Sequence, residues 1–79
     1  MQNYDFKGNF TRKKIVTNLR RIRTAYGCTQ AELAKRSGVT LRSIQMYEQR
    51  NKDINKASVE TAYRLAKILG CTIEDLIEK

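Results

Sequence analysis

The sequence predicts an all-α domain of five short helices, and three observations support this prediction. The 79 residues include no Pro and only four Gly, which favours continuous helices over strands and turns. Apolar residues recur at the spacing of a helix face, and a Ser or Thr precedes each of the five segments, as a helix N-cap does. A chain of this size forms one domain that buries about 60–65% of its unfolded surface, and a hydrophobic content of 41% suffices for a small helical core.

We expect residues 1–10 to form an N-terminal tail and residues 11–79 to form the folded domain. The tail carries three aromatic residues, Tyr4, Phe6 and Phe10. Either it is disordered or its aromatic side chains pack on the domain, and we favour packing for the residues near Phe10.

The first helix is expected to begin after Thr11, which can cap it, and to run to about Tyr26. Gly27 can end it, because glycine adopts the left-handed conformation at low cost. The apolar positions of this helix, at helical spacing, are Ile15, Leu19, Ile22 and Tyr26.

Residues 29–48 predict two further helices joined by a tight turn. Thr29 and Glu32 have the T-x-x-E spacing of a capping box at the start of the second helix, which covers residues 30–37. Gly38 can end that helix in the left-handed conformation.

The third helix is expected from Leu41 to about Gln49, with Thr40 as its cap. Ala34 lies where the second and third helices would cross, and its small side chain allows a close approach. The apolar seam between them comprises Leu33, Ala34, Val39, Ile44 and Tyr47. On this spacing alone two interpretations are open. The two helices are either a plain helical hairpin within an all-α domain or a motif that places its second helix in the major groove of DNA.

A polar loop, residues 50–57, is expected before the fourth helix, which Ser58 can cap and Gly70 can end. The inward-facing residues of this helix are Ala62, Leu65, Ala66 and Leu69. Thr72 and Asp75 give the fifth helix a second capping box. Its apolar face comprises Ile73, Leu76 and Ile77.

The charge of the chain is unevenly distributed. Residues 1–52 hold 12 Lys and Arg against 3 Asp and Glu, a net charge of +9, whereas residues 53–79 hold 4 against 5, a net charge of −1. A basic segment that coincides with the paired helices indicates a surface for a polyanion. The alternative, that these cations only solvate exposed helix faces, accounts less well for an imbalance of this size.

Several classes of protein are disfavoured by the sequence. The chain has no His, no glycine-rich phosphate loop and no metal-ligand spacing, so we predict neither an enzyme nor a bound cofactor or metal. Cys28 and Cys71 are expected to act as small hydrophobic residues. No run of 18 apolar residues exists, and the N-terminus lacks the apolar core of a signal peptide, so no membrane span and a cytoplasmic location are expected.

The paired helices resemble the helix-turn-helix of the Cro and lambda-repressor family. The residues that carry the likeness are Gln30, Leu33, Ala34, Gly38, Val39, Ile44 and Tyr47. It extends to Leu19-x-x-x-Arg23, to Glu48 and to residues 65–78, so that it covers about residues 12–78. There are two departures: Ser37 replaces an apolar residue, which suggests a slightly loosened seam, and Arg50 replaces a frequent glycine, which puts the following loop in doubt.

The third helix would read DNA through its outer face. Its exposed arc of about 140° carries one Arg, two amides and two apolar side chains. Arg pairs with guanine, Gln with adenine, and apolar groups contact the thymine methyl. Together with what the resemblance implies, this predicts the base-reading residues Thr40, Leu41, Arg42, Gln45 and Met46. For Arg42 a phosphate contact is the alternative.

Residues at the ends of the paired helices are expected to bind the sugar-phosphate backbone, where they add affinity but little sequence information. The predicted phosphate-binding residues are Gln30, Ser43, Gln49, Arg50, Asn51 and Lys52. The resemblance also implies an ion pair between Arg23 and Glu48 that ties the first helix to the end of the third. On sequence alone, Glu48 could equally be solvated.

The sequence thus predicts a sequence-specific DNA-binding transcriptional regulator, repressor-like and of prokaryotic or phage type, that binds double-stranded DNA as a homodimer. Such a dimer would use the fifth helix, the edge between the fourth and fifth helices, or the aromatic tail. Ile73, Leu76 and Ile77 could serve, although closing the core is their alternative role. The alternative function is an antitoxin, or another protein-interaction module, whose partner is a toxin or some other protein.

Overall fold

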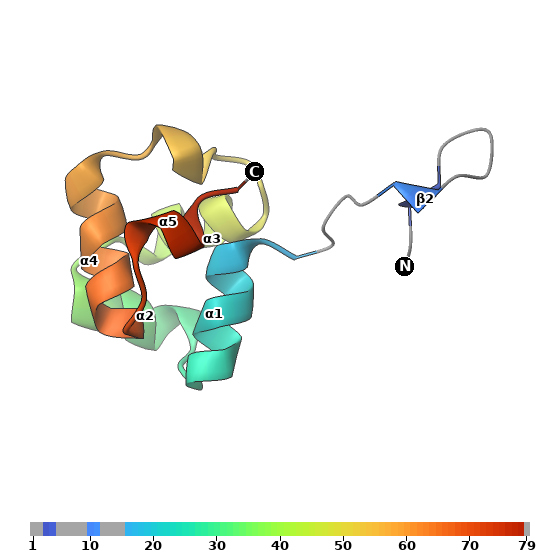
Figure 1. Ribbon diagram of the computed structural model, residues 1–79. Coiled ribbons are helices and arrows are strands. Elements are labelled where there is room, and N and C mark those ends of the chain that lie inside the picture. The colour runs from blue at the N-terminus through green and yellow to red at the C-terminus, as the bar shows by residue number, and fades with distance from the viewer. Residues whose placement is uncertain (1–2, 5–9, 12–15, 79) are drawn as a thin grey trace.

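The computed structural model describes residues 3–4, 10–11 and 16–78, and five α-helices lie within that part of the chain (Figure 1). The helices are α1 (Asn18–Tyr26), α2 (Gln30–Ser37), α3 (Leu41–Glu48), α4 (Val59–Leu69) and α5 (Ile73–Leu76), with a 3-10 helix η1 (Ile54–Lys56) before α4. Helix α2 packs against α3 and α4, and α5 packs against α1 and α4. The predicted all-α, five-helix fold is confirmed.

The core lies where these helices meet. Its fully buried side chains are Leu19, Leu33, Ile44, Leu65 and Leu76, so that each of the five helices contributes one. The residues predicted to face inward from α4 are all buried: Ala62, Leu65, Ala66 and Leu69. Burial of apolar surface on this scale is the main force that holds such short helices together, because isolated helices of this length are marginal in water.

The start of α1 differs from the sequence prediction. The helix begins at Asn18, and its N-cap is Thr17, whose side chain accepts a hydrogen bond from the Arg20 N–H; the prediction of Thr11 as the cap is wrong. Asn18, the first residue of the helix, is also held by residues near the C-terminal end of the chain: its N–H donates to the Glu78 carboxylate and its side chain to the Ile77 carbonyl.

Two short strands lie in the N-terminal segment, where residues 1–10 were predicted to form a tail. Strand β2 (Phe10–Thr11) pairs antiparallel with β1 (Asn3–Tyr4). The predicted apolar position Ile15 and the packing of the Phe10 ring lie outside what the structure describes.

Both predicted capping boxes are present. The Thr29 and Thr72 side chains accept from the third residue of α2 and α5, and the Glu32 and Asp75 carboxylates accept from the threonine N–H groups. These backbone hydrogen bonds hold the pKa of Glu32 and of Asp75 below the ordinary range. The two caps therefore stabilise the fold above the ordinary carboxyl pKa, and this contribution is lost as the pH falls through the lowered values.

The loop predicted to be polar contains a core residue. Ile54 is 7% exposed, and it opens the 3-10 helix η1, which Asp53 caps through the Asn55 N–H. A single apolar residue in a polar window has no periodicity from which its burial could be predicted. The connection between α3 and α4 is therefore fastened to the core instead of running free over the surface.

Ser37 is accommodated by a local hydrogen bond. It is buried at the end of α2, and its hydroxyl accepts from the Val39 N–H at 3.1 Å. A buried hydroxyl with a partner avoids the cost of an unsatisfied polar group. The polar substitution in the seam is thus matched by a bond that closes the turn between α2 and α3.

Arg50 adopts the left-handed conformation, with φ at +62°, at the position where the resemblance led us to expect glycine. This conformation costs a non-glycine residue about 1–2 kcal/mol. We therefore expect Arg50→Gly to be more stable than Arg50→Ala by about 1 kcal/mol. Both variants lose the same side chain, so the difference between their free energies of unfolding reports the backbone strain. Equal stabilities in chemical denaturation would contradict this account.

Candidate nucleic-acid interface

Helix α3 has one buried and one exposed side. Ile44, Tyr47 and Glu48 are buried, whereas Arg42 and Leu41 are exposed, Leu41 at 39%. Of the other three predicted base readers, Thr40 is exposed, and Gln45 and Met46 are half-buried. The exposed surface of α3 is therefore centred on its first turn, and it is narrower than the arc expected from the sequence.

The N-terminus of α3 is closed by a pair of hydroxyl residues. The Thr40 hydroxyl accepts from the Ser43 N–H at 3.1 Å and donates to the Ser43 Oγ at 2.9 Å. Thr40 was predicted to contact bases and Ser43 to contact phosphate. The structure brings the two residues together but engages their side chains with each other in the helix cap.

A buried ion pair fixes the end of α3 to α1. Arg23 donates from Nε to the Glu48 Oε2 at 2.6 Å and from Nη2 to Oε1 at 3.0 Å, and its Nη1 donates to the Cys28 carbonyl at 2.8 Å. The Arg23 and Glu48 side chains are 11% and 3% exposed. The hydrogen bond to Glu48 raises the pKa of Arg23, because it stabilises the charged guanidinium. Such bidentate pairs are strong and geometrically specific.

Gln30 joins the same group. Its Nε2 donates to the Glu48 Oε1 at 3.0 Å, so the carboxylate accepts from both α1 and α2. Sequence reasoning gave Gln30 a phosphate contact and missed this hydrogen bond, because the 18 residues that separate the partners exceed any local pattern. Glu48 is therefore the junction of three helices, and Gln30 lies beside the end of α3.

The predicted phosphate-binding residues that follow α3 lie together in an exposed loop, Gln49–Asp53. The Asn51 and Lys52 N–H groups both donate to the Met46 carbonyl, at 2.9 and 3.2 Å, and so tie the loop to α3. The Lys52 ammonium lies 5.5 Å from the centre of the Tyr47 ring, a favourable cation–π position. The loop thus presents cations from a backbone that is anchored to the helix.

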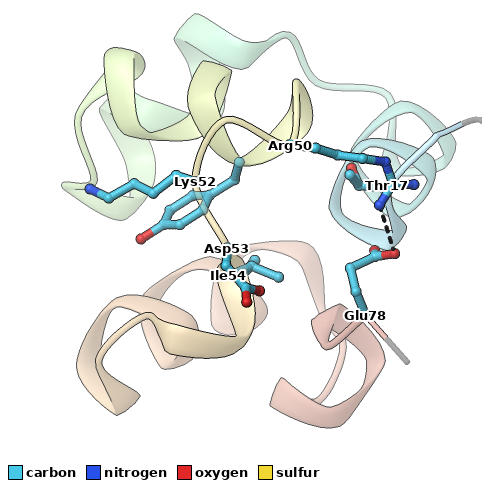
Figure 2. Close-up of a pocket in the computed structure, with 7 residues that line it drawn as sticks. Thr17, Arg50, Lys52, Asp53, Ile54 and Glu78 are labelled. Atoms are coloured by element: carbon cyan, nitrogen blue, oxygen red, sulfur yellow. Dashed lines mark hydrogen bonds and ion pairs between the residues drawn. The ribbon is translucent and has the colours of Figure 1, made fainter.

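A hollow of about 290 Å³ lies between this loop, the start of α1 and the C-terminal end (Figure 2). Its lining residues are Thr17, Tyr47, Arg50, Lys52, Asp53, Ile54 and Glu78. Figure 2 shows the Arg50 and Lys52 side chains extending in opposite directions, with Arg50 directed at Glu78. The Arg50 Nη1 donates to the Glu78 Oε1 at 3.4 Å.

Neither cysteine belongs to this surface. Cys28 is a buried free thiol, and Cys71 is a half-buried one that packs against the core. Burial is the larger cause, and the nearby Asp75 charge the smaller one, that raises the pKa of the Cys71 thiol and so favours its uncharged form. In the described residues no group of three side chains that could hold a metal ion occurs, and no helix there is long and apolar enough to cross a membrane.

Comparisons with known proteins agree with this geometry. The model of the helix-turn-helix family matches residues 19–76. The chain is also 40% identical over 60 residues to an uncharacterized HTH-type transcriptional regulator of Archaeoglobus fulgidus, and the match covers 76% of this chain and 81% of that protein. The family match spans the paired helices α2 and α3, nearly all of α1, and the whole of α4 and α5. The chain therefore belongs to the helix-turn-helix DNA-binding family of the Cro and lambda-repressor type.

Proposed function

We propose that this protein is a sequence-specific, repressor-like transcriptional regulator that inserts α3 into the major groove of double-stranded DNA. The observation that carries the proposal is the two-sided α3. Its inner side is buried and pinned by Glu48, while its first turn exposes Leu41 and Arg42. An α-helix fits the major groove, and a helix held at a fixed angle can place side chains on base edges. The name of the Archaeoglobus relative agrees with this function.

Within this proposal each predicted residue has a chemical role. Arg42 donates to the O6 and N7 of a guanine, Gln45 pairs with an adenine, and Leu41 and Met46 contact thymine methyl groups. Thr40 contributes its methyl group near the bases, because its hydroxyl is used in the helix cap. The proposed contacts to the sugar-phosphate backbone of the DNA come from Gln30, Ser43, Gln49, Arg50, Asn51 and Lys52.

The proposed active form is a homodimer on an inverted repeat, because two linked half-sites one helical turn apart, about 34 Å, multiply affinity. Leu76 does not serve in the dimer interface, since it is 1% exposed and closes the core. Ile73 packs partly against the core. The most exposed large apolar side chains of α4 are Val59 at 76% and Tyr63 at 54%, and they lie one turn apart on its outer face.

The same exposed pair, Val59 and Tyr63, favours the second candidate function, an antitoxin or other protein-interaction module on this fold. Isolated exposed apolar residues are common, but two on one helix face also suit a protein partner. A toxin gene directly adjacent to this gene would support that function.

As a transcriptional regulator in a cell without a nucleus, the protein would act in the cytoplasm. The proposed function requires no cofactor or catalytic group.

Selection of binding sites from random double-stranded DNA tests the proposal. We expect one enriched sequence with two inverted half-sites, and a complex that contains two protein chains per duplex. Failure to enrich any sequence at low salt would overturn sequence-specific binding. A single half-site bound by one chain would instead overturn the homodimer.

Arg42→Ala and Lys52→Ala are expected to weaken DNA binding in different ways. Loss of the Arg42 guanine contact should cost about 1–3 kcal/mol on the selected site and relax the preference at one base pair. Loss of the Lys52 phosphate contact should weaken binding to selected and random DNA nearly alike. Both side chains are exposed and outside the core, so both variants should melt close to the wild-type temperature.

The measurement is the affinity of each variant for the selected duplex, for single-mismatch duplexes and for a random duplex, at two salt concentrations. Lys67→Ala, which removes an exposed cation of α4, is the matched control and should bind like the wild type. Equal losses for Arg42→Ala on all duplexes would make Arg42 a phosphate contact and shift base reading to Gln45 and Met46.

A further inference from the structure

Glu78, the last residue that the structure describes, contacts three segments that are far apart in the sequence. Its carboxylate Oε2 accepts from the Asn18 N–H at the first turn of α1, and its Oε1 accepts from Arg50. Its backbone N–H donates to the Asn55 side chain at 2.8 Å, and its carbonyl accepts from the same side chain at 2.6 Å. Glu78 therefore contacts α1, the loop after α3 and η1 at once.

This position is favourable for a carboxylate. The first turn of α1 has N–H groups without helical partners and the positive end of the helix dipole, but no acidic residue of its own. Asn18 reinforces the contact, because its Nδ2 donates to the Ile77 carbonyl at 2.8 Å. The end of the chain is thus fixed on α1, and Glu78 is a firm support for whatever binds its other oxygen.

What Glu78 supports is the loop Gln49–Asp53. The backbone of this loop is tied to α3 through the Met46 carbonyl, and the Arg50 side chain extends from the loop to Glu78 (Figure 2). Helix α1 consequently holds α3 and the loop after it at two points. Near its C-terminal end, Arg23 binds Glu48 of α3, and at its N-terminal end Glu78 connects it to Arg50 of the loop.

We propose that Glu78 is a positioning residue for DNA binding, which holds the loop Gln49–Asp53 so that its backbone and Lys52 meet the DNA phosphates. This proposal rests on the proposed function. It makes a prediction opposite in sign to simple electrostatics. Glu78 is an acidic residue next to a surface that binds a polyanion, so charge alone predicts tighter binding when it is removed. Positioning predicts weaker binding.

The test compares Glu78→Ala and Glu78→Gln with Glu74→Gln, which removes the same charge from an exposed position of α5. We expect Glu78→Ala to bind the selected duplex about fivefold more weakly, a difference of about 1 kcal/mol. Glu78→Gln keeps an acceptor for Asn18 but not the charge that attracts Arg50, so its affinity should lie between Glu78→Ala and the wild type. Glu74→Gln should bind as tightly as the wild type or slightly tighter.

Two further measurements separate positioning from a general loss of stability. The slope of log K against log salt should be about one unit shallower in Glu78→Ala, as for a lost phosphate contact, whereas partial unfolding would leave it unchanged. Amide exchange at Asn51 and Lys52 should be faster in free Glu78→Ala and unchanged in Glu74→Gln. This second measurement uses no DNA, so it tests whether Glu78 holds the loop in place even if the selection experiment recovers no site.

Unchanged amide exchange at Asn51 and Lys52 would show that Glu78 does not hold this loop in place. Faster exchange together with equal or tighter DNA binding would show that holding the loop in place does not contribute to DNA binding. If Glu78→Ala does not fold, Glu78→Gln gives the same comparisons, because it retains the hydrogen-bond acceptor that caps α1.

Discussion

Replacing Glu48 with Ala is expected to destabilise the protein by about 3 kcal/mol or more. The reason is that the Arg23 guanidinium, 11% exposed, would lose both of its carboxylate hydrogen bonds and remain as an unpaired charge in the interior. Domains of this size have net stabilities of only about 5–15 kcal/mol, so the loss is a large share of the total. The melting temperature should fall by more than about 10 °C. Thermal and chemical denaturation of the two proteins measure it.

A double-mutant cycle identifies the cause. Arg23→Met in the Glu48→Ala background removes the stranded charge and fills its space with an apolar side chain, so it should recover part of the lost stability. Glu74→Ala, which removes an exposed acidic side chain, is the control and should stay within about 0.5 kcal/mol of the wild type. If the effects of Arg23→Met and Glu48→Ala simply add, the ion pair does not hold α1 and α3 together.

DNA affinity is expected to fall steeply with salt. If each protein chain neutralises about four to six phosphates, log K should change with log salt at a slope of about −3.6 to −5.4 per bound chain, or about −0.9 per phosphate. A rise from about 50 to about 200 mM salt would then weaken binding by about 100- to 2,000-fold per bound chain. Titrations of a fluorescent duplex at five or six salt concentrations give the slope directly.

The same titration with two variants locates the interface. Lys52→Ala should make the slope shallower by about one unit, whereas Lys67→Ala, which removes an equal charge from α4, should leave it unchanged. An affinity that does not depend on salt would contradict a phosphate-binding role for the basic segment of residues 1–52. A smaller slope for Lys67→Ala would extend the interface onto α4.

The paired helices were predictable because their signals are local. The Thr29–Glu32 box, the Gly38 stop and the Thr40 cap each act within about four residues, and the structure contains all three. Capping satisfies N–H groups that any helix start leaves without partners, so the same chemistry recurs whatever the surrounding fold. For that reason the bounds of α2 and α3 agree with the sequence prediction to within one residue.

The start of α1 shows where local signals fail. Thr11 and Thr17 are equally good caps, and a choice between them depends on contacts of Asn18 with residues 59 and 60 positions away. Ile54 is a second example, since nothing near it in the sequence indicates burial. In both cases the deciding energy is tertiary, and it appears only when the end of the chain and the η1 segment have folded against α1 and the core.

The candidate site is divided in the same way. The sequence placed Leu41 and Arg42 on the exposed side of the third helix, because helical periodicity alone sorts its faces. No sequence pattern predicted that Gln45 and Met46 are half-buried or that Gln30 donates a hydrogen bond to Glu48. The position of Glu78 was not predictable from a pattern either. Glu78 in particular caps α1 and binds Arg50, and both partners are far from it in the sequence.

The sequence by itself thus determined the presence of five helices, the turn between α2 and α3 and the exposure of the first turn of α3, and it predicted a basic surface. Each of these depends on interactions over about four residues or on composition. The family resemblance also implied the Arg23–Glu48 ion pair, whereas only the tertiary structure showed the hydrogen bonds of Gln30 to Glu48 and of Arg50 to Glu78. Arg23 and Glu48 are 25 residues apart, and Arg50 and Glu78 are 28 apart. A hydrogen-bond partner at such a distance is selected by the packing of the helices, and no local sequence pattern encodes it.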